Sequence, residues 1–303
     1  MNEIECEMLQ YLFEERNMTK AAERLYITQP ALTYRLQQIE KEYGVQVINK
    51  NGKSFNFTPE GEHLVAYAQK TLLDIRKTKN YILNLSKEVQ GTLRIGANKI
   101  YARYTLPPIL KSFKEAYPKV DIQLQTGFSF EALERLQNEE VYVGLIRGNY
   151  EWFDEKYLLN EENICLISKE KLNIDDLPKL PRIYYNIDAK LPIKSKDYNF
   201  LPIDKTIANW WYERFSSPPL NTMHVDSYET CKEMVKFDLG YAIVPRAYVN
   251  ESDELYCLDL NLKDGQNIKV KTWMFYRSSS LRLTIVDKFV EHLIEQNGQF
   301  PKL

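Results

Sequence analysis

Residues 18–33 read MTKAAERLYITQPALT, and this stretch decides the fold of the N-terminal end of the chain. Thr19 can cap a short helix over residues 20–25, because its hydroxyl can accept an unpaired N–H of the first turn. After a two-residue connection, Thr28 can cap a second helix that tolerates Pro30 in its first turn. Two short helices joined by a tight turn predict a helix-turn-helix.

The helix that follows Thr28 has two different faces. Its apolar stripe at helical spacing is expected to face the core: Leu32, Leu36, Ile39 and Tyr43. On the other side, the Gln29 amide can pair with adenine, and Pro30 or Thr33 can touch a thymine methyl group. The helix N-terminus also favours phosphate. The expected DNA-binding residues in this part are Lys20, Thr28, Gln29, Pro30, Thr33 and Tyr34.

A β-hairpin and a long helix come next. Asn51-Gly52 is a strong type I′ turn signal between predicted strands at 46–50 and 53–57. Lys50 and Lys53 flank this turn, where a wing would meet the DNA backbone or minor groove. A long helix is then predicted to begin with a Thr58 cap and Pro59 and to reach about Val89.

The long helix carries a heptad seam. Its members are spaced 4-3-4-3-4-3-4 along the chain: Leu64, Ala68, Thr71, Ile75, Thr78, Ile82, Leu85 and Val89. Such a seam predicts self-association as a coiled coil, which suits a protein whose two reading helices contact two half-sites. The alternative is a helix that packs on its own domain.

The rest of the chain alternates strands with helices. The first predicted unit has strands at 92–97, 120–124 and 141–146 and helices at 104–117 and 130–137. A second unit is expected from about residue 163, with helices around 210–215 and 228–237 and strands at 223–225 and 239–244. A final strand at 270–275 and helix at 284–295 are expected to return to the first unit. This alternation predicts doubly wound α/β units with parallel sheets.

Ligands of such folds collect at the carboxyl ends of the strands, between the two units. That rule selects as effector-binding residues Asn98, Lys99, Ile100, Thr126, Gly127, Arg147, Phe200, Asp226 and Ser227. Lys99 and Arg147 would favour a small anion. Each of these two cations is also compatible with a solvated surface position.

Composition narrows the function classes. The chain has 303 residues and a net charge of −2, which argues against a simple polycation. Basic charge is nevertheless concentrated locally, because residues 16–58 hold seven Lys or Arg against three Glu. The N-terminus lacks the features of a secretory signal, and we find no apolar run long enough for a bilayer, so a cytoplasmic protein without membrane association is expected.

Cysteine and histidine usage gives no metal or cofactor motif, and none is expected. The four Cys and three His are scattered, so buried reduced thiols are the simplest interpretation. A redox pair such as Cys231 with Cys257 stays open.

Other function classes account for parts of the sequence at most. We find no phosphate-cradling glycine motif, nucleophile elbow or paired metal ligands, so we expect no enzyme. A solute-binding protein would share the C-terminal fold but would leave the helix-turn-helix unexplained. A DNA-binding architectural protein without a ligand stays open.

Residues 18–33, together with 36–44 and Thr58-Pro59-Glu60-Gly61, resemble the LysR-type transcriptional regulators. The resemblance implies a winged helix-turn-helix over 1–58, a linker and dimerisation helix over 59–90, and a two-lobed Rossmann-like effector domain of the type 2 periplasmic-binding-protein kind. Lobe I would comprise 91–162 and 268–303, and lobe II 163–267. It further implies a homodimer through the linker helix, commonly assembled into a tetramer, whose binding to promoter DNA responds to a metabolite and affects RNA polymerase.

Some positions depart from the family pattern. Tyr34 stands where the family usually has Arg or a small polar residue, and Tyr142 and Asp238 replace the usual Asp and Gly. Asp can adopt the left-handed conformation, so a helix end at Asp238 is expected to survive. The wing has Lys50 and Lys53 where Arg is common. The resemblance also marks turn positions by glycines, namely Gly96, Gly127, Gly144 and Gly240.

Overall fold

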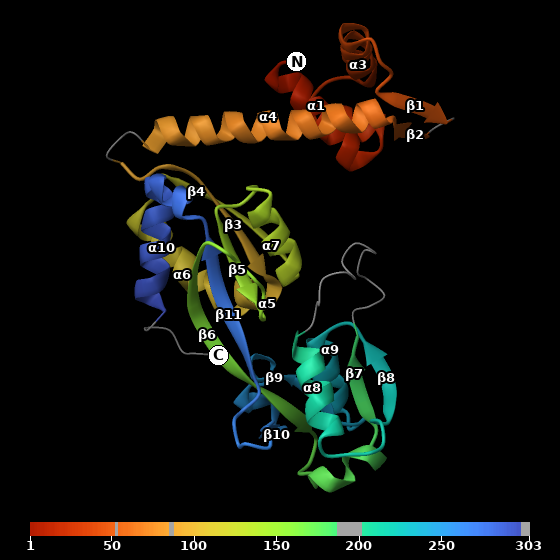
Figure 1. Ribbon diagram of the computed structural model, residues 1–303, viewed down its shortest axis with the longest axis vertical. Helices are drawn as coiled ribbons and strands as arrows, with labels where there is room; N and C mark the ends of the chain where they lie inside the picture. Colours follow the sequence, from red (N-terminus) through yellow and green to blue (C-terminus); the bar gives the residue numbers. More distant parts are fainter. Residues whose placement is uncertain (52–53, 85–87, 187–201, 298–303) are drawn as a thin grey trace. The chain divides into compact units, whose positions relative to one another are not determined.

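The computed structural model describes residues 1–51, 54–84, 88–186 and 202–297, and the chain divides into two units, Met1–Glu88 and Val89–Leu303. The first unit is a helix-turn-helix with a hairpin and a long helix (Figure 1). Its elements are α1 (Glu3–Glu15), α2 (Met18–Arg24), α3 (Gln29–Tyr43), β1 (Ile48–Asn51), β2 (Ser54–Phe57) and α4 (Pro59–Asn84).

Polar caps fix where the reading helices begin. The Asn17 side chain accepts the N–H groups of Thr19 and Lys20, so α2 begins at Met18. The predicted Thr19 cap was therefore wrong, because the Asn side chain lies earlier and satisfies two donors. The predicted Thr28 cap of α3 is confirmed by its bond from the Ala31 N–H at 3.4 Å.

The core of the first unit lies between α1, α3, the hairpin and the start of α4. Leu32, Leu36 and Ile39 of α3 are buried as predicted, whereas Tyr43 is 41 % exposed. The predicted stripe therefore ends one turn early. Two members of the predicted heptad seam, Leu64 and Ala68, are also buried in this core, so the first part of α4 packs on its own domain.

The start of α4 rests against the backbone at Val47. The Thr58 N–H donates to the Val47 carbonyl at 3.0 Å, and the Thr58 hydroxyl accepts the Gly61 N–H at 2.9 Å. A Cβ at Gly61 would lie 2.1 Å from the same carbonyl oxygen, so only glycine allows this approach. The predicted start at Pro59 is confirmed, and α4 is described as far as Asn84, whereas Val89 lies outside any helix and belongs to the second unit.

The hairpin forms, but its register differs from the predicted one. Asn51 pairs with Ser54 and Ile48 with Phe57, so Asn51 belongs to β1, and residues 52–53 lie outside the described residues. The prediction that Asn51 lies in the turn is therefore wrong, because the register is fixed at the base of the hairpin, where Thr58 bonds to Val47 and Phe57 packs on Phe13.

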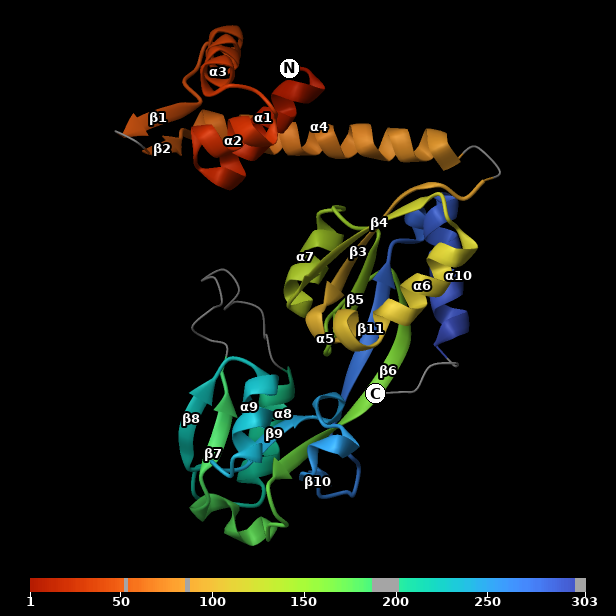
Figure 2. The ribbon, with the colours of Figure 1, turned by 180° about the vertical axis from the view of Figure 1, so that it is seen from behind.

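The second unit begins with a lobe built on a mixed sheet. Its elements are β3 (Gly91–Asn98), α5 (Lys99–Tyr104), α6 (Leu106–Ala116), β4 (Val120–Gly127), α7 (Ser129–Gln137), β5 (Val143–Arg147), β11 (Lys269–Tyr276), η6 (Ser278–Arg282) and α10 (Thr284–Gln296). β3 is parallel to β4 and β5, whereas β11 runs antiparallel to β5. The all-parallel expectation was wrong here, because β11 enters from the other lobe. α6 and α10 cover one side of the sheet and α7 the other (Figure 2).

A long strand joins the two lobes. β6 (Glu155–Ser168) pairs with β11 through Asn163 and with β9 and β10 from Ile164 onward. The other elements of the second lobe are η1 (Ile174–Lys179), β7 (Arg182–Tyr185), α8 (Pro202–Tyr212), β8 (Asn221–Val225), α9 (Tyr228–Lys236), β9 (Ala242–Pro245), η4 (Arg246–Tyr248), η5 (Glu251–Asp253) and β10 (Tyr256–Asp259). Within the described residues, no helix is both long and apolar enough to cross a membrane.

Three residues test the predictions about turns and helix ends. Asp238 adopts a φ of 58°, which confirms that it ends α9 in place of glycine. Gly96 and Gly144 lie directly opposite each other inside β3 and β5, so their predicted role as turn residues is wrong. They allow α7 to pack closely: a Cβ at Gly144 would lie 3.2 Å from Leu136 Cδ2.

We expect Gly61→Ala to destabilise the first unit by about 1–3 kcal/mol, because the added methyl group forces α4 away from the Val47 carbonyl. Urea unfolding of the full chain, followed by circular dichroism, measures this loss. The exposed neighbour Glu62 provides the control, and Glu62→Ala should change stability by less than about 0.5 kcal/mol. Equal stability of Gly61→Ala and the original chain would contradict this account.

Candidate DNA interface and effector site

The first turn of α3 presents a polar surface beside α2. Lys20, Thr28, Gln29 and Pro30 are exposed, and Tyr34 is 63 % exposed one turn further along α3. Thr33 is half-buried between them. Because Leu32 and Leu36 are fixed in the core, these side chains point away from it on a rigid helix. Five of these six predicted residues thus lie at the N-terminal part of α3, and Lys20 lies on the neighbouring helix α2.

The turn between α2 and α3 adds a residue that the sequence analysis missed. Tyr26 is 97 % exposed and adopts a φ of 55°, a conformation that bulky residues rarely take. The Ile27 N–H bonds to the Ala22 carbonyl at 3.1 Å and holds the turn. The available signal was a large aromatic residue in a tight interhelical turn, outside the apolar stripe that forms the core.

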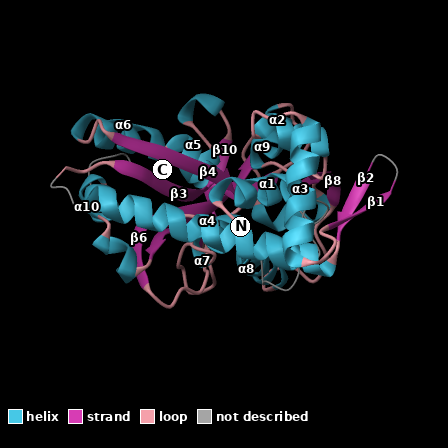
Figure 3. Cartoon of the chain, turned by 90° about the horizontal axis from the view of Figure 1, so that it is seen from above, coloured by secondary structure: helices cyan, strands magenta, loops and turns pink. Residues whose placement is uncertain are grey.

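One cation of this region, Arg24, is paired within the first unit and has a structural role. The Arg24 guanidinium bonds to Glu14 and Glu15 and lies 3.9 Å from the centroid of the Tyr11 ring. Its charge therefore ties α2 to α1. In the predicted wing, Lys50 belongs to β1, whereas Lys53 lies outside the described residues. The ribbon of β1 and β2 projects beyond the helices of the first unit (Figure 3).

In the second unit, three strand ends meet at a buried serine. The Asn98 amide, at the end of β3, donates to Ser129 Oγ at 3.0 Å, and the Arg147 N–H, at the end of β5, donates to the same oxygen at 3.0 Å. Asn98 also caps α5 by accepting the Ile100 N–H. Ser129 was not predicted, although it begins α7 shortly after the end of β4, close to the predicted Thr126 and Gly127.

Arg147 forms a buried ion pair with Glu162. The Arg147 Nε donates to Glu162 Oε1 at 2.8 Å, and the two side chains are only 8 % and 3 % exposed. The other carboxylate oxygen of Glu162 accepts the Ala247 N–H at 2.9 Å. The pair thus ties β5 and β6 to η4, and Glu162 neutralises the charge that was predicted to attract an anion.

Apolar and charged contacts join α5 to the second lobe. Ile100 packs against the cluster that holds Tyr185, Tyr228 and Tyr248. The Tyr185 and Tyr228 rings stack at 3.9 Å between centroids. Burial raises the pKa of Tyr248, so its hydroxyl stays neutral at physiological pH.

One ion pair also links the lobes, between Arg103 of α5 and Glu229 of α9 at 3.4 Å. Apart from Ile100, the strand-end rule selected none of these residues. Arg103, Tyr228 and Glu229 lie on helices, and Tyr185 ends β7, a strand that the sequence did not predict.

The other predicted effector residues have diverse surroundings. Lys99 is exposed, and its Nζ lies 4.9 Å from the centroid of the Phe128 ring. Thr126 is exposed, and Gly127 is buried beside the Glu131 carboxylate. Ser227 caps α9 and donates to Glu229 Oε2 at 2.8 Å, next to the exposed Asp226. Phe200 lies outside the described residues.

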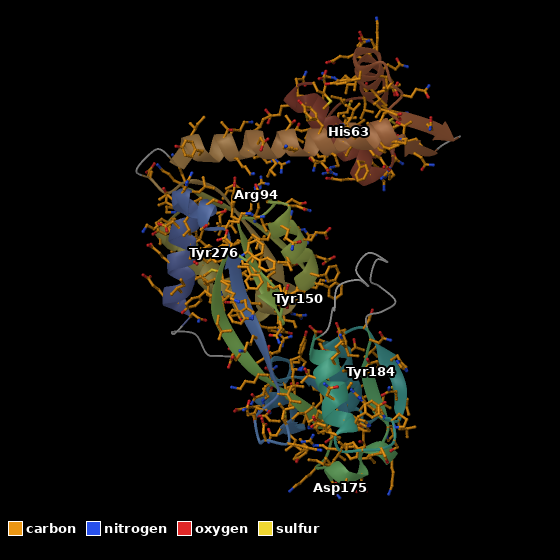
Figure 4. All side chains as sticks on the ribbon, in the orientation of Figure 1. His63, Arg94, Tyr150, Asp175, Tyr184 and Tyr276 are labelled. Atoms are coloured by element: carbon orange, nitrogen blue, oxygen red, sulfur yellow. The ribbon has the colours of Figure 1, made fainter. Side chains whose placement is uncertain are left out.

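The second lobe also has an open surface pocket of about 850 Å³. Its lining includes Arg214, Phe215, Tyr256 and Asp175, the last of which is labelled in Figure 4. No predicted effector residue lines it. This pocket is therefore separate from the strand ends at Asn98 and Arg147.

The cysteines are arranged differently from the pair considered in the sequence. Cys231 is buried in α9, whereas Cys257 lies beside Cys165 and Asp259. The Cys165 thiol donates to the Cys257 sulfur, and this bond together with the Arg246 guanidinium holds the pKa of Cys257 below its ordinary value.

A winged helix-turn-helix joined through a long helix to a two-lobed α/β domain defines a class of DNA-binding transcription regulators with a ligand-binding domain. Two family models match this chain. The "Bacterial regulatory helix-turn-helix protein, lysR family" model covers residues 5–62, and the "LysR substrate binding domain" model covers residues 86–298. The chain belongs to the LysR family of transcriptional regulators.

Relatives and solved structures agree with this assignment. The chain is 41 % identical over 294 residues to the uncharacterized HTH-type transcriptional regulator YraN of Bacillus subtilis (strain 168), covering 97 % of each chain. It is 34 % identical to YkuM of the same organism, covering 98 % of this chain and 99 % of YkuM. The crystal structure of full-length CbnR complexed with its target DNA has the same fold, with a TM-score of 0.66 at 17 % identity, covering 98 % of this chain and 99 % of that one.

We expect Arg147→Met to lower the free energy of unfolding by about 3–5 kcal/mol, because it leaves Glu162 charged and buried without its partner. The double variant Arg147→Met with Glu162→Leu should recover a large part of this loss. Urea unfolding of the original chain, both single variants and the double variant gives the coupling. A single variant as stable as the original chain would show that the pair does not hold the lobes.

Proposed function

We propose that this regulator reads promoter DNA through the first turn of α3 and changes its binding when a small anion occupies the space between the lobes. The observation that carries the DNA proposal is the exposure of Gln29 and Pro30 on a helix whose opposite face is fixed in the core. Action at a promoter places the protein in the cytoplasm and brings it near RNA polymerase.

Each predicted DNA-binding residue has a definite role in this proposal. The Gln29 amide pairs with an adenine edge, while Pro30 and Thr33 contact thymine methyl groups. Thr28 and Lys20 bind phosphate at the N-terminal ends of α3 and α2, with Lys50 and Lys53 of the wing on the adjacent backbone. Tyr34 replaces a charged contact by an aromatic one and alters which base is preferred there.

We expect Gln29→Ala to weaken binding to DNA from upstream of its own gene by about 10- to 100-fold, and to leave binding to random DNA unchanged. Fluorescence anisotropy at two salt concentrations measures both affinities. Gln38→Ala, an exposed Gln on the same helix outside the first turn, is the matched control and should bind like the original chain. If Gln29→Ala and the original chain discriminate between the two DNAs equally, base reading by this turn is refuted.

We also propose a homodimer through the far part of α4, which can assemble further into a tetramer. Tyr67, Tyr81 and Ile82 are each more than half exposed, and Tyr67 and Ile75 line a shallow groove along the helix. The Thr71 and Thr78 hydroxyls bond to carbonyls of their own helix at 2.9 Å, so they can face an apolar partner without losing a hydrogen bond. Two copies would place two reading helices on two half-sites.

The proposed effector is a small carboxylate held at the strand ends of the first lobe. The exposed Lys99 ammonium supplies positive charge beside Asn98 and Ser129, and Thr126 supplies a hydroxyl. Arg147 supports this site through its buried pair with Glu162. A ligand that contacts both lobes would favour one lobe arrangement and so change DNA binding.

We expect a small carboxylate that raises the melting temperature of the original chain to lose this effect in Lys99→Gln. A panel of metabolite carboxylates in a thermal-shift assay finds the ligand, and Lys111→Gln, an exposed lysine on α6, is the control. A carboxylate that stabilises both variants equally would place the anion elsewhere.

A further inference from the structure

Three potential metal ligands meet at one place in the second lobe. Cys165 of β6 and Cys257 and Asp259 of β10 have donor atoms that all lie within 4.8 Å of one another. Asp259 is directly opposite Cys165 in the strand pair, and Cys257 is opposite Ile167, so the three side chains share one face of the sheet. Neither the family assignment nor the proposed effector site uses this group.

Asp259 leaves part of its hydrogen-bonding capacity unused. Its Oδ2 accepts the Asn163 amide at 2.6 Å, whereas its Oδ1 is buried and has no hydrogen-bond partner. A buried carboxylate oxygen without a partner is costly, and a bound cation would remove that cost. Cys165 is fully buried at the same place. This oxygen is thus available to a cation, independently of the two sulfurs.

The spacing suits a bound metal better than a disulfide. Ligand atoms around a tetrahedral zinc lie about 3.3–3.8 Å apart, so donors within 4.8 Å need to move by only about 1 Å. A disulfide needs Cα atoms closer than about 7 Å, whereas diagonal neighbours in an antiparallel pair are about 7–8 Å apart. A Cys165–Cys257 disulfide would therefore span a diagonal at the upper limit of the Cα separation that a disulfide allows.

The surrounding charge can adjust to a cation. Arg246 donates to the Cys257 sulfur, and because its side chain is exposed it can turn to solvent when a metal takes that sulfur. Two thiolates and one carboxylate would carry three negative charges, more than the two of a divalent cation, and Arg246 can offset the excess. Thiolates select soft or borderline cations over Mg²⁺ or Ca²⁺.

We propose that Cys165, Cys257 and Asp259 form a binding site for a thiophilic divalent cation such as Zn²⁺, with water as the fourth ligand. The site shares η4 with the lobe contact already described, because Arg246 faces Cys257 and the next residue, Ala247, bonds to Glu162. Metal binding would thus act on the element that holds the Arg147–Glu162 pair.

The test titrates Co²⁺ into the full-length chain, reduced with a phosphine and freed of metal. We expect one Co²⁺ per chain, with the intense near-ultraviolet band of a thiolate–cobalt bond, and displacement of Co²⁺ by Zn²⁺. Cys257→Ser and Asp259→Asn should each weaken binding, Cys257→Ser by at least about 100-fold with loss of most of the band. Cys231→Ala, a buried cysteine of the same lobe outside the site, should bind like the original chain.

Circular dichroism confirms that each variant is folded, and Asp259→Asn keeps the test valid if a cysteine variant is not. Absence of a thiolate–cobalt band in the reduced original chain would overturn the proposal. So would folded Cys257→Ser and Asp259→Asn that bind Co²⁺ as tightly as the original chain, or Cys231→Ala that loses binding as they do. A chain that bears a Cys165–Cys257 disulfide and takes up no metal after reduction would assign the pair to redox chemistry instead.

Discussion

The first unit depends on one close backbone approach, where α4 begins against the Val47 carbonyl. That oxygen accepts the Thr58 N–H, and Gly61 leaves the space that the contact requires. Val47 directly precedes β1, so the same contact fixes the base of the hairpin. The positions of the wing, the linker helix and the core under α3 therefore depend on one another. A base-reading helix needs such rigidity, because hydrogen bonds to base edges tolerate little displacement.

In the second unit, the paired strands β6 and β11 connect the two lobes. β6 contributes Glu162 to the buried pair with Arg147, and its next residues pair with the strands of the second lobe. The chain thus passes between lobes on a continuous strand rather than a loose linker. At this position the lobes are held by a charge pair, a tyrosine cluster and an exposed ion pair, so the proposed ligand at the strand ends would act on these contacts.

The sequence predictions were correct where the local structure depends on the properties of a single residue. Thr28, Pro59 and Asp238 were assigned correctly because capping, first-turn proline and left-handed backbone are properties of single residues. The mixed sheet, the hairpin register and the partner of Arg147 depend on residues distant in the chain. Local sequence patterns do not reveal these long-range contacts. The strand-end rule also does not distinguish an exposed cation such as Lys99 from a buried, paired one such as Arg147.

Base reading by the exposed turn of α3 and its action in a two-fold assembly can be tested together by selecting bound duplexes from a random DNA pool with the full-length protein. We expect an enriched motif of two inverted half-sites whose centres lie about 10 base pairs, or a multiple of that, apart. A bound pool that shares no motif would contradict it and would leave only phosphate contacts.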